Sequence, residues 1–250
     1  GGSGISYAEF SYALIQGYDF LHLNRHFGVS LQLCGADQWG NSIAGVDLIR
    51  RIEGNEAHVY STPLVINKAT GRKFGKSEEG AIWLDEKKTS VFKFYQFWLN
   101  ADDEGVVDYA KIFTLLDKAA IEVLEKAVRE NPAGREAQKT LAREVTTIVH
   151  GADRAESAER VTAVLFGDKP VAELSDADID LLSTEIATVS RGSSVVEALV
   201  QAGAANSNGE ARRLLGGGAI SVDGQKLAED TVLQERALIK KGKNSFILVQ

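Results

Sequence analysis

The sequence contains almost no sulfur: one cysteine, Cys34, and no methionine, not even an initiator. A single cysteine excludes an internal disulfide framework and is typical of a reducing compartment. The missing methionine and the linker-like opening Gly1-Gly2-Ser3-Gly4 favour a processed chain, a fragment or an engineered product. With 44% apolar residues, the chain is expected to fold by burying a hydrophobic core.

The sequence also lacks long apolar runs, a leader and a cluster of metal ligands. No run approaches the roughly 18 apolar residues that span a bilayer, and no basic-then-apolar segment opens the chain. The four histidines are scattered and form no ligand set with the cysteine. We therefore expect a soluble, cytoplasmic protein with no membrane partner and no protein-bound metal.

Positive charge is scarce, because the sequence has 28 lysines and arginines but 35 aspartates and glutamates, which gives a net charge of −7. An acidic balance argues against binding to nucleic acid. Residues 193–250 differ, since they hold seven basic and six acidic residues and so a net charge of +1. This local excess leaves nucleic acid open as a partner of the tail.

The first hundred residues present elements in the order of an α/β domain. A helix is predicted over residues 6–26, where apolar residues recur at helical spacing. These residues are Phe10, Leu14, Tyr18 and Leu21. A second helix is predicted over 43–52, with Asn41 or Ser42 as its cap. Strands are predicted over residues 29–34, 59–67 and 81–85.

The remaining sequence predicts a helical stretch and a small final unit. From residue 89 to about residue 167 the pattern is helical, broken only at Asn131-Pro132-Ala133-Gly134. Residues 168–192 have the composition of a linker with at most one short helix. The final unit predicts helices over 194–202 and 208–215, a strand from 219 to 222 and a tight hairpin at Asp223-Gly224.

Three polar side chains share one face of the first predicted helix. Tyr12, Gln16 and Asp19 stand at i, i+4 and i+7, within an arc of roughly 60°. A phenol, an amide and a carboxylate on one stripe are suited to binding a small polar ligand. A solvated or interdomain face would show the same pattern, so spacing alone leaves both interpretations open.

The loop Gly35–Asn41 directly follows a predicted strand. Ligands of open α/β sheets bind at the carboxyl ends of strands, where small residues let a ligand approach the backbone. Asp37 and Gln38 would supply polar contacts there, although an ordinary strand–helix turn fits as well. Cys34 is interpreted as a small strand residue, because no histidine partner for a nucleophile is identifiable.

Lys73-Phe74-Gly75-Lys76-Ser77 is the sharpest local motif. Two ammonium groups flanking a glycine suit a loop that closes on polyphosphate and neutralises charge during phosphoryl transfer. The motif is not a Walker loop, because the spaced glycines are absent. Lysine-rich hairpin loops are common, so the motif alone does not establish a site.

Together these segments resemble the bacterial tyrosyl-tRNA synthetase family. Residues 5–20 are similar to its tyrosine-binding helix, residues 35–41 to its nucleotide and amino-acid loop, and residues 73–77 to its form of the class I KMSKS signature. Tyr95-Gln96-Phe97-Trp98 and Val149-His150-Gly151 also match the family pattern. The likeness covers nearly all of residues 4–250, in order and at the family's spacing.

The resemblance implies roles for individual residues. Asp19 would accept the phenolic hydroxyl of L-tyrosine, Tyr12 and Gln16 would hold its ammonium group, and Gln38 would contact its carboxyl region. ATP would be bound by Gly35, Asp37, Lys73, Lys76 and Ser77. Lys73 and Lys76 would be the catalytic residues, because their charges would steady the departing pyrophosphate.

Residues 193–250 resemble the small RNA-binding module named after a ribosomal small-subunit protein. Residues 207–213 match the opening of its second helix, and residues 219–224 match its turn into a hairpin. The resemblance implies that five cations meet tRNA phosphates: Arg212, Arg213, Lys240, Lys241 and Lys243.

The sequence departs from the family in several places. It has no His-x-Gly-His motif, since His22 and His26 lie in the first helix in a different context. Cys34 stands where many members have glycine, and Val91 where many have proline. We therefore expect half of the active site and much of the dimer interface to be missing. The chain alone is expected to lack tyrosine-dependent ATP–pyrophosphate exchange.

The implied fold is α/β. It comprises the C-terminal part of a class I Rossmann-like catalytic domain (1–99), a helical anticodon-region domain (100–168), a linker (169–192) and a small α+β RNA-binding module (193–250). The implied function is ATP-dependent activation of L-tyrosine, with Mg-ATP as substrate, and transfer to tRNA(Tyr), by a homodimer in the full-length enzyme. Two alternatives stay open: a non-catalytic RNA-binding module derived from a synthetase, and one chain of a split enzyme.

Overall fold

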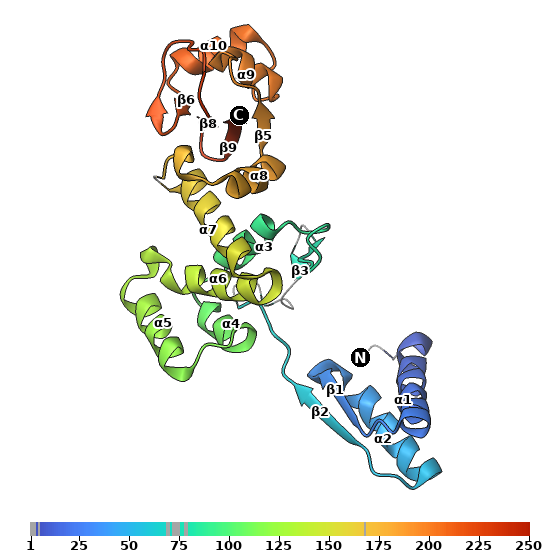
Figure 1. Cartoon of the computed structure of the whole chain (residues 1–250). Coiled ribbons are helices and arrows are strands. Elements are labelled where there is room, and N and C mark those ends of the chain that lie inside the picture. The colour runs from blue at the N-terminus through green and yellow to red at the C-terminus, as the bar shows by residue number, and fades with distance from the viewer. Residues whose placement is uncertain (1–3, 5, 69–70, 72–75, 78–79, 168) are drawn as a thin grey trace. The chain divides into compact units, whose positions relative to one another are not determined.

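The computed structural model describes residues 4, 6–68, 71, 76–77, 80–167 and 169–250. These residues belong to two compact units, 1–76 and 77–250 (Figure 1). Each unit has its own packing and is described by itself.

The first unit is a βαβ crossover preceded by a long helix. Strands β1 and β2 are parallel, in register from Leu31 opposite His58 to Gly35 opposite Thr62. Helix α2 connects them, and α1 lies beside α2 (Figure 1). The elements are α1 (Tyr7–Phe27), β1 (Leu31–Gly35), the 3-10 turn η1 (Ala36–Gln38), α2 (Trp39–Glu53) and β2 (His58–Thr62). Because parallel strands end at the same edge, η1 and the chain after β2 meet there.

Two glycines let α1 and α2 pack closely. A Cβ atom added at Gly45 would lie 2.8 Å from Phe20 Cδ1, and one added at Gly17 would lie 3.2 Å from the backbone nitrogen of Gly45. Apolar side chains next to this crossing form a small core: Phe20, Leu21, Ile49 and Ala57, with Val29 and Val46 against them. The absence of side chains at the crossing therefore sets the distance between the two helices.

The first predicted helix is confirmed as α1, but most of its apolar stripe is not buried. Leu21 is in the core, whereas Phe10, Leu14 and Tyr18 are each more than half exposed. The strand predicted over 59–67 ends at Thr62, because Pro63 follows and has no backbone N–H to give to a neighbouring strand.

Helix α2 begins earlier than the sequence pattern predicts. Its N-cap is Gln38, so the prediction of Asn41 or Ser42 as the cap is wrong. The reason is that η1 continues directly into the helix, which leaves residues 39–42 already helical. Ser42 is instead fully buried.

The two units divide within a short hairpin. Strand β3 (Lys76–Ser77) pairs with β4 (Gly80–Ala81). The strand predicted over 81–85 therefore ends after its first residue. Asp85 instead starts a turn, since its carbonyl accepts hydrogen bonds from the backbone of Lys88 and Thr89.

The second unit begins with packed helices. Helices α3, α6 and α7 contact one another, and α4 and α5 pack against α6. Their bounds are α3 (Val91–Leu99), α4 (Val106–Phe113), α5 (Lys118–Glu130), α6 (Glu136–His150) and α7 (Ala152–Phe166). The predicted break is confirmed as the 3-10 turn η2 (Pro132–Gly134). Three further breaks that the pattern did not show lie at residues 100–105, at residues 114–117 and at Gly151, whose φ of 90° suits glycine.

A five-stranded sheet ends the second unit. Its strand order is β5-β9-β8-β6-β7, with β5 parallel to β9 and the other pairs antiparallel. The strands are β5 (Ala187–Val189), β6 (Ile220–Val222), β7 (Gln225–Lys226), β8 (Ala237–Lys241) and β9 (Ser245–Val249), and helices α9 (Val195–Gln201) and α10 (Asn208–Gly216) precede β6. Asp223 and Gly224 join β6 to β7 with φ of 48° and 81°, which confirms the predicted two-residue hairpin.

The sheet is covered on both faces. Helices α9 and α10 bury one face, with Leu199, Leu215 and Ile239 in the shared core. The other face carries Leu238, Phe246 and Leu248, which pack with residues of α7 and of the helix α8 (Asp176–Glu185). The module predicted over 193–250 therefore has a second core that it shares with the preceding helices.

Residues 169–192 are not the linker that their composition predicts. They form the 3-10 turn η3 (Val171–Glu173), α8 (Asp176–Glu185) and β5. Leu174, Ile179 and Leu182 are buried in the core that β8 and β9 share with α7. The segment looks like a linker in sequence because it is short and acidic, and because one of its buried side chains, Asp178, is polar.

Candidate functional site

The structure places the predicted stripe of α1 on a partly exposed face. Tyr12 is 58% exposed, and Asp19 is also exposed. Gln16 is half-buried, and its Nε2 donates to Ser42 Oγ of α2 at 3.4 Å. The three residues therefore remain accessible on one side of α1, and Gln16 turns toward the first turn of α2.

The predicted loop forms the turn η1 at the carboxyl end of β1. A Cβ atom at Gly35 would lie 2.7 Å from Asp37 Oδ1, so glycine leaves the room that this carboxylate occupies. Gln38 Nε2 lies 3.4 Å from Asp37 Oδ2, and Asn41 Nδ2 donates to Gln38 Oε1 at 3.0 Å. This chain of contacts turns the carboxylate and the amide toward the end of the strand, where a ligand of an α/β sheet is expected.

A buried serine connects the stripe to the strand. Ser42 Oγ accepts from Gln16 and donates to Cys34 Sγ at 3.6 Å. Cys34 precedes Gly35, so these two hydrogen bonds connect the amide of α1 to the strand residue next to the loop after β1. In the sequence, Ser42 is recognisable only as a candidate helix cap. Its buried position three residues before Gly45, at the close helix crossing, is what brings it to Gln16.

The lysine motif is described only in part. Lys73 lies outside the described residues. Lys76 and Ser77 belong to β3, of which the backbone is described. Their assignment to ATP binding therefore stays a prediction.

The five predicted RNA-binding cations do not share one face. Neighbouring residues of a strand point to opposite sides of a sheet, and Lys240 lies over the ring of Phe246, 5.3 Å from its centroid. Lys241 Nζ, on the other side, donates to the carbonyl of Ala204 at 2.5 Å. Lys241 is thus bound to the fold itself, and the exposed cations are Arg212, Arg213 and Lys243.

Arg213 and Lys241 lie near one acidic residue, Glu210. The pKa of this carboxyl is lowered, first by hydrogen bonds from Asn206 and then by the charges of Lys241 and Arg213. The carboxylate therefore offsets part of the positive charge on this side of the module.

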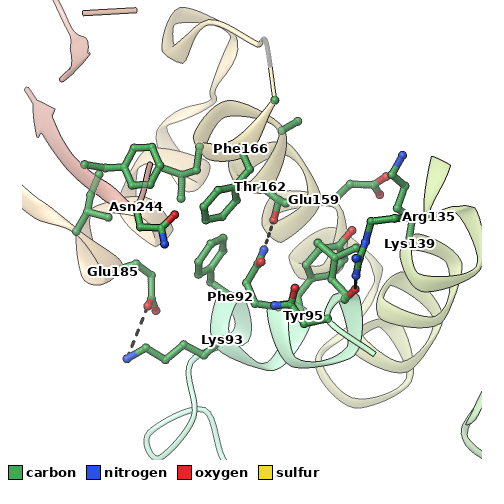
Figure 2. Close-up of a pocket in the computed structure, with 18 residues that line it drawn as sticks. Phe92, Lys93, Tyr95, Arg135, Lys139, Glu159, Thr162, Phe166, Glu185 and Asn244 are labelled. Atoms are coloured by element: carbon green, nitrogen blue, oxygen red, sulfur yellow. Dashed lines mark hydrogen bonds and ion pairs between the residues drawn. The ribbon is translucent and has the colours of Figure 1, made fainter. Parts of the chain in front are cut away.

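A separate pocket of about 1030 Å³ lies in the second unit (Figure 2). Phe92 and Phe166 face each other across it, and a Lys93–Glu185 ion pair of 3.8 Å closes one side. Burial, and then the nearby Glu159 charge, raise the pKa of Tyr95 to about 12, so this phenol stays protonated near neutral pH. None of the predicted site residues lines the pocket.

Two further observations concern metals and membranes. Among the described residues, histidine, cysteine and carboxylate side chains form no group of three or more that could hold a metal ion. Within the same residues, no helix has the length and apolar character to cross a membrane.

Comparison with known proteins identifies two matching families. Residues 1–167 match the family described as tRNA synthetases class I (W and Y). Residues 173–249 match the SYY-like C-terminal domain of tyrosine–tRNA ligase.

Individual relatives are similar over nearly the whole chain. The tyrosine–tRNA ligase of Klebsiella pneumoniae is 41% identical over 98% of this chain and 60% of its own length. That of Latilactobacillus sakei is 42% identical over 99% of this chain and 62% of its own length. The chain thus spans about 60% of the length of the curated relatives it matches.

Solved structures that resemble this chain are also tyrosyl-tRNA synthetases. A C-terminally truncated mitochondrial tyrosyl-tRNA synthetase from Aspergillus nidulans has a TM-score of 0.51 and 31% identity. The match covers 63% of this chain and 44% of that one.

Proposed function

The chain belongs to the class I tRNA synthetase family of the tryptophan and tyrosine enzymes, and from this we propose that it is part of a tyrosine–tRNA ligase. Its relatives carry that name. The chain would supply the amino-acid stripe, the loop after β1 and the RNA-binding module. The substrates would be L-tyrosine, Mg-ATP and tRNA(Tyr), in the cytoplasm, with a homodimer as the assembly of the full-length enzyme.

The proposed reaction has two steps. The carboxylate of tyrosine attacks the α-phosphorus of ATP, the bond to the bridging oxygen breaks, and pyrophosphate leaves. A ribose hydroxyl at the end of the tRNA then attacks the carbonyl of tyrosyl-adenylate, and AMP leaves. No acyl-enzyme is needed, because positioning and charge stabilisation account for catalysis.

The residue roles of this proposal follow the family resemblance. Asp19 accepts the phenolic hydroxyl, Tyr12 and Gln16 hold the ammonium group, and Gln38 contacts the carboxyl region. The ATP ribose is bound by Gly35 and Asp37, and the polyphosphate by Lys73, Lys76 and Ser77, with both lysines stabilising the departing pyrophosphate.

One observation supports placing these roles in a single site. The hydrogen bonds from Gln16 to Ser42 and from Ser42 to Cys34 link the middle of α1 to the carboxyl end of β1. An amino acid lying along α1 would therefore have its carboxylate near the loop of Gly35, Asp37 and Gln38. This is the arrangement that adenylate formation needs, because the carboxylate has to reach the α-phosphate.

The proposal is tested through tyrosine specificity. In an enzyme where a His-x-Gly-His half completes this chain, Asp19→Asn should lower the ratio of kcat/KM for tyrosine over phenylalanine by roughly 10- to 100-fold. The amide loses the charged acceptor of the hydroxyl, a hydrogen bond worth about 1.5–3 kcal/mol. Asp37→Asn is the matched control and should raise the KM for ATP without changing the ratio.

An unchanged ratio in Asp19→Asn would remove this residue from the amino-acid site. A completed enzyme that binds tRNA but gives no tyrosine-dependent pyrophosphate exchange would favour the alternative of a non-catalytic RNA-binding module.

A further inference from the structure

Ser42 is the fully buried polar residue of the first unit that lies against a proposed ligand-binding side chain. Its exposed fraction is 0%, and the close approach of α1 and α2 at Gly17 and Gly45 holds it in place. A buried hydroxyl has to satisfy its hydrogen-bonding capacity with protein groups. The direction of its two hydrogen bonds therefore determines how its neighbours are oriented.

The hydroxyl has one proton to give and two lone pairs to accept with. The proton goes to Cys34 Sγ at 3.6 Å. The lone pairs remain for Gln16, whose Nε2 donates at 3.4 Å. The NH2 end of the Gln16 amide is thus turned inward.

The other end of the amide is left for a ligand. Gln16 Oε1 accepts no hydrogen bond within the part of the chain that the structure describes. An ammonium group has three donors and no acceptor, so it binds Oε1 and is repelled by NH2. A flip of the amide by 180° would replace the acceptor with two donors.

We propose that Ser42 is a positioning residue that fixes the Gln16 amide with Oε1 toward the ammonium group of the amino-acid substrate, and that Cys34 holds the serine proton in the orientation this requires. The inference rests on the proposed role of Gln16 and adds what determines its polarity. It also gives the thiol of Cys34, next to the loop after β1, a role other than that of a nucleophile.

Two variants remove the two hydrogen bonds of Ser42 one at a time. Ser42→Ala removes the acceptor for Nε2, and the amide is then free to flip. Cys34→Ala leaves the hydroxyl in place but releases its proton, which can then be donated to Oε1 and stabilise the flipped amide. Both changes should weaken ammonium binding, although neither residue touches the ligand.

The experiment uses the enzyme in which a His-x-Gly-His half completes this chain, and it measures the binding of three ligands by equilibrium dialysis at millimolar concentrations. Tyrosine and tyramine carry the ammonium group, and 3-(4-hydroxyphenyl)propionate lacks it. Ser42→Ala should weaken tyrosine and tyramine binding roughly tenfold, the loss of one hydrogen bond to a charged group. The binding of 3-(4-hydroxyphenyl)propionate should stay within about twofold. Cys34→Ala should likewise weaken the binding of tyrosine and tyramine and leave that of 3-(4-hydroxyphenyl)propionate nearly unchanged.

Two controls make the result specific. Ser30→Ala, a change at an exposed serine of the same unit, should leave all three affinities unchanged. In a Gln16→Ala background, Ser42→Ala should have no further effect, because its action passes through the amide. Circular dichroism of each variant shows whether the unit is folded.

Equal losses for all three ligands, or additive losses in the double variant, would overturn the positioning role while leaving the proposed function intact. A completed wild-type enzyme that binds none of the three ligands would overturn the proposed role of the stripe and the inference with it.

Discussion

At the residue scale, a two-point ion pair of the second unit joins Arg160 to Asp178. The guanidinium donates to both carboxylate oxygens at 2.9 Å, and Ser175 adds further hydrogen bonds. Burial alone would raise the pKa of Asp178, but the hydrogen bonds from Arg160, Ser157 and Ser175 outweigh it and lower the pKa to about 2. The contact fastens α8 to α7.

A depressed carboxyl pKa has a definite pH signature. The folded state holds Asp178 ionised more strongly than the unfolded state does, so its contribution of about 2 kcal/mol is present above roughly pH 4 and is lost toward pH 2. Asp178→Asn should therefore lower the free energy of unfolding by about 2 kcal/mol at neutral pH. In urea titrations, the difference from wild type should shrink as the pH falls.

The exposed Asp180 of the same helix supplies the matched control. Asp180→Asn should change stability by less than about 0.5 kcal/mol at every pH. If the difference in free energy of unfolding between wild type and Asp178→Asn were the same at neutral and at acid pH, the lowered pKa of Asp178 would be contradicted.

Two exposed arginines of the final module are predicted to bind tRNA phosphates. Arg212 and Arg213 lie on α10 and are both exposed, so they are free to meet phosphates. Replacing both by alanine should weaken tRNA binding and reduce the slope of log affinity against log salt by about 1.5–2. Lys241→Ala should reduce the slope less, because its ammonium group is bound to Ala204. Filter binding over a series of salt concentrations measures both slopes, and equal slopes would contradict the distinction.

At the element scale, the crossing of α1 and α2 depends on the space at Gly45. Gly45→Ala places a methyl group within 3 Å of the Phe20 side chain. Overpacking of this kind costs about 1–3 kcal/mol. Gly40 lies in the same helix with nothing within 4 Å of an added Cβ, so Gly40→Ala should be neutral or stabilising by up to about 1 kcal/mol. Urea unfolding of the two variants should move in opposite directions, and a stabilised Gly45→Ala would show that the helices are not in close contact.

The elements that the sequence predicted well are those with a local signal. The helical spacing of α1, the break at η2 and the Asp223-Gly224 turn depend on residues within one element. Ser42 and Asp178 were not predicted, because the partners that determine their roles, Gln16 and Arg160, lie 26 and 18 residues away. The site residues of α1 and of the loop were found from the family resemblance, and their roles remain predictions.

At the scale of the whole molecule, the final module and the helices before it share a core. Removing residues 193–250 takes away β9, the partner of β5, and uncovers apolar residues of α7 and α8 such as Val161, Leu165 and Leu182. The shortened chain should therefore unfold at a lower temperature and bind more of the dye ANS than the full chain. A deletion that leaves both measurements unchanged would show that the module is separable, as the sequence alone had suggested.

The place of β9 in the sheet has a consequence for synthesis on the ribosome. It is the last of the five strands in the sequence, yet it lies between β5 and β8. Domains generally fold as they emerge, from the N-terminal end onward. Here β5 is synthesised before its partner strand β9, which is translated almost sixty residues later, so β5 stays unpaired on that side until β9 emerges. Until then the apolar side chains of α7 and α8 that pack against β9 lack this cover, so a ribosome that stalls before β9 would leave a nascent chain that chaperones and proteases can recognise as unfinished.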